Sequence, residues 1–342
     1  MKECRYYFMI VSIAVVAYNE TEFLPLLLED IVSQDYPHNK IELLLIDSMS
    51  TDDTPEIMRK FKENSDFLVC KLLKNKKRVI PAGHNVAIDN FIGDALIRID
   101  AHARIPFDFI SKNVEALSGE EVAVGGRRPC ITGRSDYVGR LLLSAENSVF
   151  GSGFAPYRTS RQRLYSKSLF CGMYRREVFN TVGRFNEQLP RSEDNEMCYR
   201  IRKAGYRLCY SPEIVFFQYM RASLFSMLRQ KMLNGYAVGK TLAFSPKCFS
   251  LFHFAPLALI ISLSVAIILC FGGDSFPLGF IGTVYGAVLS AATVVAISNE
   301  PILSNLFLPL VLFLVHLFYG IGTILGLTVF PFWRVYIKRN VL

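Results

Sequence analysis

The chain has 342 residues, of which 51% are hydrophobic, and it carries 38 Lys and Arg against 30 Asp and Glu. A chain this apolar can bury enough surface to offset its ordering entropy, which excludes an intrinsically disordered protein. The charge is unevenly distributed along the chain, because Asp274 and Glu300 are the only formally charged residues between positions 248 and 333. The composition therefore predicts a charged globular part followed by an apolar part. The net charge of +8 suits an anionic ligand or membrane surface at least as well as nucleic acid.

The eight cysteines are scattered, without a CxxC pair or a pairing rhythm. This spacing argues against a metal cluster and against a disulfide scaffold. We therefore expect the globular part to work in a reducing compartment.

The first apolar run, Tyr6–Tyr18, follows Lys2 and Arg5 and has two interpretations. Basic residues before an apolar stretch are typical of a secretion signal. The run is rich in β-branched residues, however, and it stops at Asn19 and Glu20 rather than at small residues. These features favour a buried parallel strand.

Helices and strands are predicted to alternate after this run. Residues 21–34 space their apolar positions as a helix, and Thr54 before Pro55 predicts the cap of a second helix that reaches about Glu63. Such alternation indicates a parallel sheet with helices on both faces, whose ligands bind beyond the carboxyl ends of the strands. The other predicted elements are strands at 41–47, 67–73 and 95–100 and a helix at 81–90.

The middle of the chain is less regular. Residues 125–140 and 150–163 are rich in Gly and Arg, and we expect them to form loops around a polyanion. A helix is predicted over 194–204 and a short strand near 207–210. Residues 221–240 mix apolar with basic groups, which predicts a helix along a membrane surface.

Three apolar stretches near the end, at 252–273, 277–298 and 305–331, each exceed the roughly 20 residues that a bilayer crossing needs. Their topology stays open. Basic clusters precede the first stretch and follow the third, and three crossings would place them on opposite sides, against the positive-inside rule. Either one segment is re-entrant or the rule fails here. The cluster before the first stretch is Lys231, Lys240 and Lys247, and the cluster after the third is Arg334, Lys338 and Arg339.

Acidic residues at predicted strand and helix ends are the candidates for chemistry. Asp100 and His102 can both reach one divalent ion and a bound diphosphate, and an imidazole suits Mn²⁺ better than Mg²⁺. Asp47 can accept hydrogen bonds from a base or a ribose. Asp194 can act as a general base, while Glu193 binds another hydroxyl. Each has an alternative explanation. Asp100 could cap the next turn, Asp47 could belong to a helix-capping cluster, and the acidic residues at 193–196 could simply interact favourably with a helix dipole.

Four segments carry a resemblance in their order and spacing: VVAYNE (15–20), LLIDSMSTDDT (44–54), GHNVAIDNFIGDALIRIDAHA (83–103) and CGMYRREVFNTVGRFNEQLPRSEDNEMCYRIRKAGYRL (171–208). Over roughly residues 9–240 the chain resembles membrane-anchored family 2 glycosyltransferases of the GT-A fold. The DAHA segment, where most relatives have DAD, is similar to the ExoA type, the glucosyltransferases of succinoglycan biosynthesis.

The resemblance implies roles for particular residues. Gly83 and Asn85 would lie against the nucleotide and the sugar, and Asp100 with His102 at the metal (Mn²⁺ or Mg²⁺) and the diphosphate. Asp194 would be the catalytic base, with Glu193 beside it at the acceptor. The uridine of a UDP-sugar would be held by Ala17, Tyr18, Asn19, Glu20 and Asp47.

Three departures from the family pattern matter. His102 replaces a second aspartate, which leaves Mn²⁺ or Mg²⁺ open, and His84 stands where a basic residue is common. Arg229 and Gln230 stand where relatives carry a Q-x-x-R-W element that contacts acceptor and diphosphate, but the local sequence is only similar. A single transfer is therefore expected rather than processive synthesis. The arginine that assists the leaving diphosphate stays open among Arg127, Arg128, Arg158 and Arg229.

The expected protein has an α/β GT-A catalytic domain over 1–220 with a mostly parallel sheet, an amphipathic interfacial linker over 221–250, an all-α transmembrane region over 251–333 and a basic tail over 334–342. The expected function is inverting, metal-dependent transfer of a sugar, glucose favoured, from a UDP-sugar to a polyprenyl-diphosphate-linked glycan. It would serve exopolysaccharide or cell-surface polysaccharide synthesis at a bacterial inner membrane, with the catalytic domain in the cytoplasm and no nucleic acid partner.

Three other functions stay open at this point. A protein that binds a nucleotide sugar but has lost catalysis would explain the DAH segment, although Asp194 is intact. A transporter component would need intramembrane charges, and the predicted spans hold no Asp, Glu, Lys or Arg, with His316 as an ionisable residue. A nucleotidyltransferase of similar fold would have little use for the acidic pair at Glu193 and Asp194.

Overall fold

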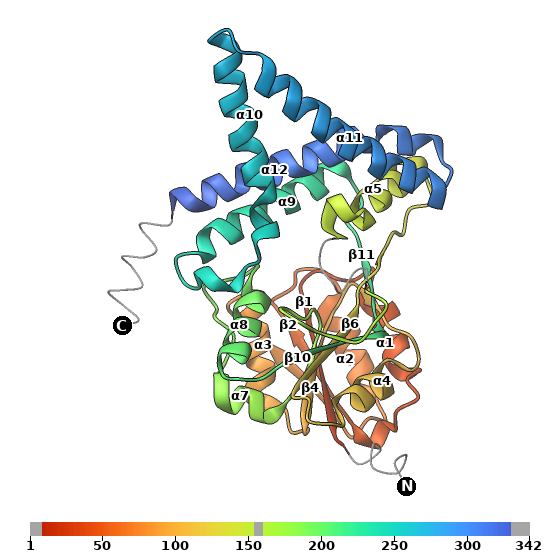
Figure 1. Ribbon diagram of the computed structural model, residues 1–342. Coiled ribbons are helices and arrows are strands. Elements are labelled where there is room, and N and C mark those ends of the chain that lie inside the picture. Colours follow the sequence, from red (N-terminus) through yellow and green to blue (C-terminus); the bar gives the residue numbers. More distant parts are fainter. Residues whose placement is uncertain (1–8, 154–159, 330–342) are drawn as a thin grey trace. The chain divides into compact units, whose positions relative to one another are not determined.

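The computed structural model describes residues 9–153 and 160–329, and the chain forms two compact units (Figure 1). The first unit comprises Met1–Pro129 and Pro156–Gln218, and the second comprises Cys130–Ala155 and Tyr219–Leu342. The predicted basic tail, the last residues of the third apolar stretch and Arg158 lie outside the described residues.

The first unit is built on an eight-stranded sheet in the order β3-β2-β1-β4-β9-β6-β10-β8. The first four strands in this order are parallel. They confirm the predicted parallel half of the sheet, and their near-continuous apolar sequence suits strands that are covered on both faces. Their bounds are β1 (Val11–Ala17), β2 (Ile41–Asp47), β3 (Val69–Lys74) and β4 (Ala95–Asp100).

The other half of the sheet is mixed. Strand β9 (Met173–Arg175) is antiparallel to both β4 and β6 (Ala123–Arg127). Strand β10 (Leu208–Val215) runs parallel to β6 and antiparallel to β8 (Leu164–Ser166). The strand predicted near 207–210 is therefore longer than expected.

The loop predicted over 125–140 is wrong in two places. Residues Ala123–Arg127 form the interior strand β6, and Tyr137–Asn147 forms helix α5 in the second unit. The glycine that suggested a loop has a packing role, because a Cβ on Gly126 would lie 1.9 Å from the Ile214 carbonyl oxygen. Glycine in a strand marks such a close backbone approach.

Helices cover both faces of this sheet, as predicted (Figure 1). Side chains of one face pack with α1, α2 and α4, and those of the other face pack with α3, α7 and α8. Successive residues of β1 alternate between the faces: Ile13 and Val15 belong to one buried cluster and Ala14 to the other. The bounds are α1 (Leu24–Val32), α2 (Thr54–Glu63), α3 (Ile80–Asn90), α4 (Phe109–Leu117), α7 (Arg176–Val182) and α8 (Glu193–Lys203).

Two predicted helix starts shift by one residue. Thr54 was expected as the cap of α2, but Asp53 occupies the N-cap and Thr54 is the first helical residue. Helix α8 begins at Glu193 rather than at Asp194, so both acidic side chains lie in its first turn, where the helix dipole favours negative charge.

The second unit is helical and contains α5, α9 (Leu224–Thr241), α10 (Ala255–Phe271), α11 (Phe276–Asn299) and α12 (Leu308–Thr328). Three stretches within the described residues are long and apolar enough to cross a membrane: Leu251–Phe271, Phe276–Asn299 and Leu303–Thr328. They match the three predicted spans closely.

Helices α9 and α12 interlock through two glycine pairs. A Cβ on Gly235 or Gly239 of α9 would lie 2.0 Å from the Tyr319 oxygen or 2.5 Å from the Thr323 oxygen. Gly322 and Gly326 of α12 approach the backbone of α9 just as closely. Small residues four apart let helix backbones touch in this way. The segment that was predicted to lie along a membrane surface therefore has one face packed on the third apolar span.

Candidate active site

The parallel register brings three strand ends to one edge of the sheet. Ala17 is paired with Asp47, and Val16 with Asp100. Ligands of such sheets bind beyond this edge. The structure therefore groups Asp47 and Asp100 with the residues that follow β1, as the sequence predicts.

The loops after β1 and β2 are tied together by hydrogen bonds. Asn19 has φ of 54°, in the left-handed region that Asn tolerates better than most residues. Its backbone N–H donates to Ser50 Oγ (3.1 Å), and its side-chain oxygen accepts from the Thr51 N–H (2.8 Å). The Glu20 N–H donates to Thr54 Oγ1 (2.8 Å). This network holds the backbone of both loops in one conformation.

Asp47 and Tyr18 differ in exposure at this edge of the sheet. Asp47 is buried, and its Oδ1 accepts the Ser50 N–H (2.9 Å). This bond closes a turn in the loop after β2, before α2 begins at Thr54. The side chain of Tyr18 is half exposed and offers an aromatic face.

The start of α3 is pressed against β1. A Cβ on Gly83 would lie 2.6 Å from Val16 Cγ1, so a larger residue would push the helix away. Asn85 is buried: its Nδ2 donates to the Phe185 oxygen and to Glu187 Oε1 (both 3.0 Å), and its Oδ1 accepts the Phe185 N–H (2.8 Å). These contacts show Asn85 joining α3 to residues 185–187. His84 is also buried, and burial together with the charge of Arg98 holds its pKa well below the usual range.

Asp100 and His102 direct their polar atoms at one point. Asp100 Oδ2 and His102 Nε2 both contact the Nε2 amide group of Gln218, at 3.0 and 3.3 Å. On its other side, His102 Nδ1 lies 3.1 Å from Glu20 Oε1. A carboxylate accepts, so Nδ1 carries the proton and Nε2 presents its lone pair beside Asp100. Gln218 lies on β11 (Phe217–Tyr219), which pairs with β5 (Ala103–Arg104) just after His102.

This donor pair fits a divalent cation. An oxygen and an imidazole nitrogen converge on one point, and a carboxylate on the far ring nitrogen orients histidines that bind metals. Among the described residues no group of three or more His, Cys, Asp and Glu could hold a metal ion. A cation held by Asp100 and His102 would therefore need further ligands, which substrate phosphate oxygens commonly supply.

Asp194 is held by a buried arginine. Arg98 forms an ion pair with Asp194 Oδ1, and its guanidinium lies 4.8 Å from the centre of the Phe185 ring. Arg98 and Asp100 are two residues apart on β4, so they point to the same face of the sheet. The structure thus brings the predicted base to the face that carries the predicted metal ligand. Burial raises the pKa of Asp194, and the positive charge of Arg98 opposes that rise.

Glu193 lies deeper than Asp194. Its side chain is buried, and Oε2 has no hydrogen-bond partner in the described part of the chain. Burial, followed by repulsion from Asp194, raises the pKa of Glu193 to about 8. A raised pKa favours the neutral carboxyl group, which can donate a hydrogen bond.

Sequence reasoning missed two contributors to this site. Arg98 interrupts the apolar part of β4, and a charge at such a buried position signals a buried partner. Gln218 gave no signal, because a glutamine in a short strand has no distinctive pattern. Arg128, one of four predicted candidates, donates to Gln218 Oε1 (2.6 Å). Arg229 and Gln230 belong to α9 of the second unit.

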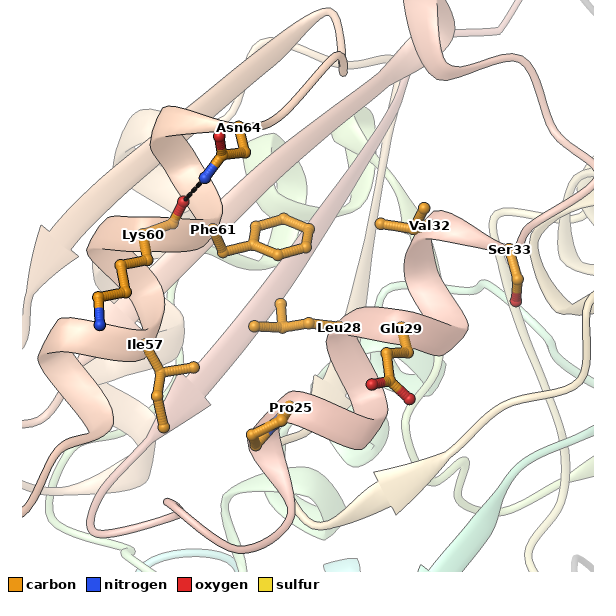
Figure 2. A pocket seen from close by; sticks show the side chains of 9 residues that line it. All are labelled: Pro25, Leu28, Glu29, Val32, Ser33, Ile57, Lys60, Phe61 and Asn64. Carbon is orange, nitrogen blue, oxygen red and sulfur yellow. Dashed lines mark hydrogen bonds between the residues drawn. The ribbon is translucent and has the colours of Figure 1, made fainter.

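A groove of about 580 Å³ between α1 and α2 is separate from this site (Figure 2). It contains none of the residues named above. Its lining is mostly apolar and includes two charged residues, Lys60 and Glu29; the other lining residues are Pro25, Leu28, Val32, Ser33, Ile57, Phe61 and Asn64.

Comparison with known proteins identifies the class. The model of the glycosyl transferase family 2 domain matches residues 12–183, about half of the chain. The chain belongs to glycosyl transferase family 2, and it is a glycosyltransferase.

Individual proteins extend the likeness. The succinoglycan biosynthesis protein ExoA of Rhizobium meliloti is 30% identical over 233 residues, which are 67% of this chain and 68% of that protein. A dolichyl N-acetyl-alpha-D-glucosaminyl phosphate 3-beta-D-2,3-diacetamido-2,3-dideoxy-beta-D-glucuronosyltransferase of Methanococcus voltae is 25% identical over 324 residues, 93% of this chain and 97% of that protein.

A solved structure shows the same fold. The mannosyltransferase PcManGT from Pyrobaculum calidifontis, in complex with GDP-Man and Mn²⁺, matches with a TM-score of 0.60 and 20% identity over 97% of this chain and 87% of that chain. The predicted GT-A fold, the enzyme class and the resemblance to the ExoA type are confirmed.

Proposed function

We propose that this glycosyltransferase is inverting and metal-dependent and moves a sugar from a UDP-sugar, with glucose favoured, to a lipid-linked glycan. One observation carries the proposal: Arg98 of β4 forms an ion pair with the carboxylate of Asp194, and Arg98 lies on the same face of β4 as Asp100. A base and a diphosphate site side by side are what a single displacement at an anomeric carbon needs.

The donor binds at the loops after β1 and β2. Ala17, Tyr18, Asn19 and Glu20, with Asp47, are proposed to hold the nucleoside, because these loops are rigidly cross-linked at the carboxyl edge. Gly83 and Asn85 of α3 are proposed to lie against the nucleotide and the sugar. The nucleotide is proposed to be UDP on the resemblance to the ExoA type, although the structural neighbour was solved with GDP-Man.

Asp100 and His102 are proposed to hold Mn²⁺ or Mg²⁺. When bound, the cation neutralises charge that develops on the leaving diphosphate. The presence of Mn²⁺ in the complex of PcManGT supports this choice. Arg128, which Gln218 connects to Asp100, is proposed to add positive charge at the same position.

Asp194 takes the proton from the acceptor hydroxyl as that oxygen attacks the anomeric carbon. The new bond forms on the face opposite the leaving group, the bond from carbon to the diphosphate oxygen breaks, and the nucleoside diphosphate leaves with the electron pair. One displacement inverts the configuration. The positive charge of Arg98 opposes the rise that burial causes in the pKa of Asp194, and the carboxyl group of Glu193, whose pKa is raised, is proposed to donate a hydrogen bond to the acceptor. General-base catalysis contributes about 10²–10⁴-fold.

The acceptor is proposed to be a glycan on polyprenyl diphosphate, made for exopolysaccharide or cell-surface polysaccharide. The name of the Methanococcus voltae relative describes a dolichyl-phosphate-linked acceptor, and the two proteins align over nearly their full lengths. Three apolar helices would keep the enzyme at the bilayer that holds such a lipid. We propose an inner (cytoplasmic) membrane with the first unit on the cytoplasmic side, and Arg229 and Gln230 as acceptor contacts. Protease protection of the first unit in right-side-out vesicles tests the orientation.

The decisive experiment is transfer by the detergent-purified chain from a panel of UDP- and GDP-sugars, with Mn²⁺, Mg²⁺ or EDTA. Nucleotide release should occur with one donor, disappear with EDTA, and fall by at least 10²-fold in Asp194→Asn while nucleotide binding remains. Asp66→Asn is the matched control, because Asp66 is an exposed aspartate of the same unit. Equal loss of binding and turnover in Asp194→Asn would refute the base assignment. Binding without turnover in the wild type would favour an inactive nucleotide-sugar binder.

A further inference from the structure

The apolar helices of the second unit differ in how much of their surface other helices cover. Helices α10 and α11 meet at a tip (Figure 1), and among the described residues of α10 only Ala266 is buried. The buried residues of α11, which are Leu289, Ala292 and Thr293, all lie in its second half. The part of this hairpin near the tip therefore exposes mostly apolar side chains, which is typical of helices that cross a bilayer.

Helix α12 is lined along most of its length by α9. A step of four residues along α9, from Gly235 to Gly239, corresponds to a step of four along α12, from Tyr319 to Thr323. The two helices therefore run in the same direction with their backbones in contact. Nearer their starts, they share one buried apolar cluster. Because the contact is this long, α9 and α12 must lie at the same depth in or beside a membrane.

Helix α9 carries charges along this contact. Arg229 is exposed and lies between the shared cluster and the glycine contact, so it is level with the middle of α12. Lys231 is buried and forms an ion pair with Glu146 of α5 (2.6 Å). If α12 crossed the bilayer, α9 would lie beside it and bring the exposed guanidinium into the hydrocarbon region, which is costly. At the level of the headgroups, the charges of α9 reach water while the exposed apolar side chains of α12 reach the acyl chains.

Both ends of the α10–α11 hairpin return to the helices at its base. A Cβ on Gly320 of α12 would lie 2.7 Å from the oxygen of Pro256, in the first turn of α10. Glu300, at the C-cap of α11, pairs with Arg140 of α5 (3.5 Å). Asp274 lies in the turn at the tip. A hairpin that crosses a bilayer twice returns the chain to the side on which it entered.

We propose that, of the three apolar helices, only α10 and α11 cross the bilayer, and that α9 and α12 lie as a pair in the plane of one interface. Lipid is then the partner of the exposed apolar surface of α10, α11 and α12. Both basic clusters lie on the same side of the membrane, as the positive-inside rule requires, whereas three crossings would separate them. The inference does not depend on the reaction that the enzyme catalyses. The clusters are Lys231, Lys240 and Lys247, and Arg334, Lys338 and Arg339.

The side on which the chain ends distinguishes two crossings from three. In a bacterial host, green fluorescent protein fused after Leu342 of the full chain should fluoresce, and alkaline phosphatase fused there should be inactive, because each works on only one side of the inner membrane. Asp274→Cys, at the tip, should react with a membrane-impermeant maleimide in intact cells. Lys62→Cys, at an exposed position of the first unit, is the matched control and should react only in inverted vesicles. The background chain has serine at Cys4, Cys70 and Cys270, because the other described cysteines are buried.

The depth of α12 is the second measurement. Nitroxide labels on cysteines at exposed apolar positions report depth through their relaxation by oxygen and by a water-soluble nickel complex, in vesicles of phosphatidylethanolamine and phosphatidylglycerol. Labels at Leu310, Ile321 and Leu325 should all lie within about 5–10 Å of the headgroups. A crossing helix would spread positions 310 and 325 over about 22 Å. Ile261 and Ile268 of α10 provide the reference for a crossing helix and should differ in depth by about 10 Å.

Three results would overturn the proposal. A depth that changes steadily from Leu310 to Leu325 would make α12 a third crossing. Active alkaline phosphatase after Leu342, together with protection of Lys62→Cys in intact cells, would place the end of the chain on the opposite side from the first unit. Equal, shallow depths at Ile261 and Ile268 would mean that the hairpin lies on the bilayer instead of crossing it.

Discussion

Replacing Arg98 by methionine tests whether the Arg98–Asp194 pair holds the proposed base. The substitution keeps an unbranched side chain but leaves the Asp194 carboxylate beside buried Glu193 without its cation. Removing one partner of a buried ion pair costs roughly 3–5 kcal/mol. Because 19% of the Asp194 side chain remains exposed, solvent offsets part of this loss, and we expect about 3 kcal/mol. At roughly 2–4 °C per kcal/mol, the melting temperature should fall by about 6–12 °C.

The same variant should change the pH profile of kcat/KM. Burial raises the pKa of Asp194 and Arg98 lowers it, so removal of Arg98 should move the acidic limb to higher pH. Arg98→Lys keeps the charge but loses the guanidinium fork, and its shift should be smaller. A merely structural role would lower the melting temperature without moving this limb.

The assays are thermal unfolding in detergent and initial rates over a pH series. Asp194→Asn in the Arg98→Met background removes the unpaired charge, so the double variant should melt above Arg98→Met, and the double-mutant cycle measures the coupling. If Arg98→Met melted within about 1 °C of the wild type and kept its acidic limb, a loss of 3 kcal/mol would be excluded and Arg98 would not be the positioning residue.

Three further predictions concern the same unit. Burial raises the pKa of Glu193 to about 8, so its contribution to the free energy of unfolding is fully present below its ordinary pKa and is lost as the pH rises toward 8. Glu193→Gln should therefore reduce the fall in melting temperature between pH 5 and pH 8. An unchanged dependence of the melting temperature on pH would contradict the assignment. His102→Asp replaces an imidazole by an oxygen ligand, so the ratio of Mg²⁺- to Mn²⁺-supported rates should rise, and a fall in that ratio would count against His102 as a ligand. Gly126→Ala places a Cβ 1.9 Å from the Ile214 oxygen and should lower the melting temperature by several degrees, whereas Gly119→Ala, with open space around it, should be tolerated far better.

None of these tests involves the groove between α1 and α2. Its walls are mostly apolar, and none of the residues that line it belongs to the site at the strand ends. Substitutions in it, such as Phe61→Ala, serve as a comparison for stability effects that do not pass through the active site.

The sequence alone determined the features that depend on neighbouring residues. Apolar runs and helical spacing predicted the first four strands and the three membrane-length helices, because burial on both faces or in a bilayer leaves a continuous local pattern. The proximity of Asp100 and His102 was also visible, since His102 follows only two residues after the strand ends at Asp100. Motif order then identified the family.

Only the tertiary structure decided which distant residues meet. Arg98 binds Asp194, which lies 96 positions later, because β9 returns antiparallel beside β4 and is followed by α7 and α8 on the same face. Gln218 reaches Asp100 and His102 because β11 pairs with β5. Gly126 was mistaken for a loop residue, because its close approach to β10 depends on a strand pairing over a long stretch of chain. Local sequence patterns predict whether a residue is buried, whereas the order of the strands in the sheet determines which distant residue it contacts.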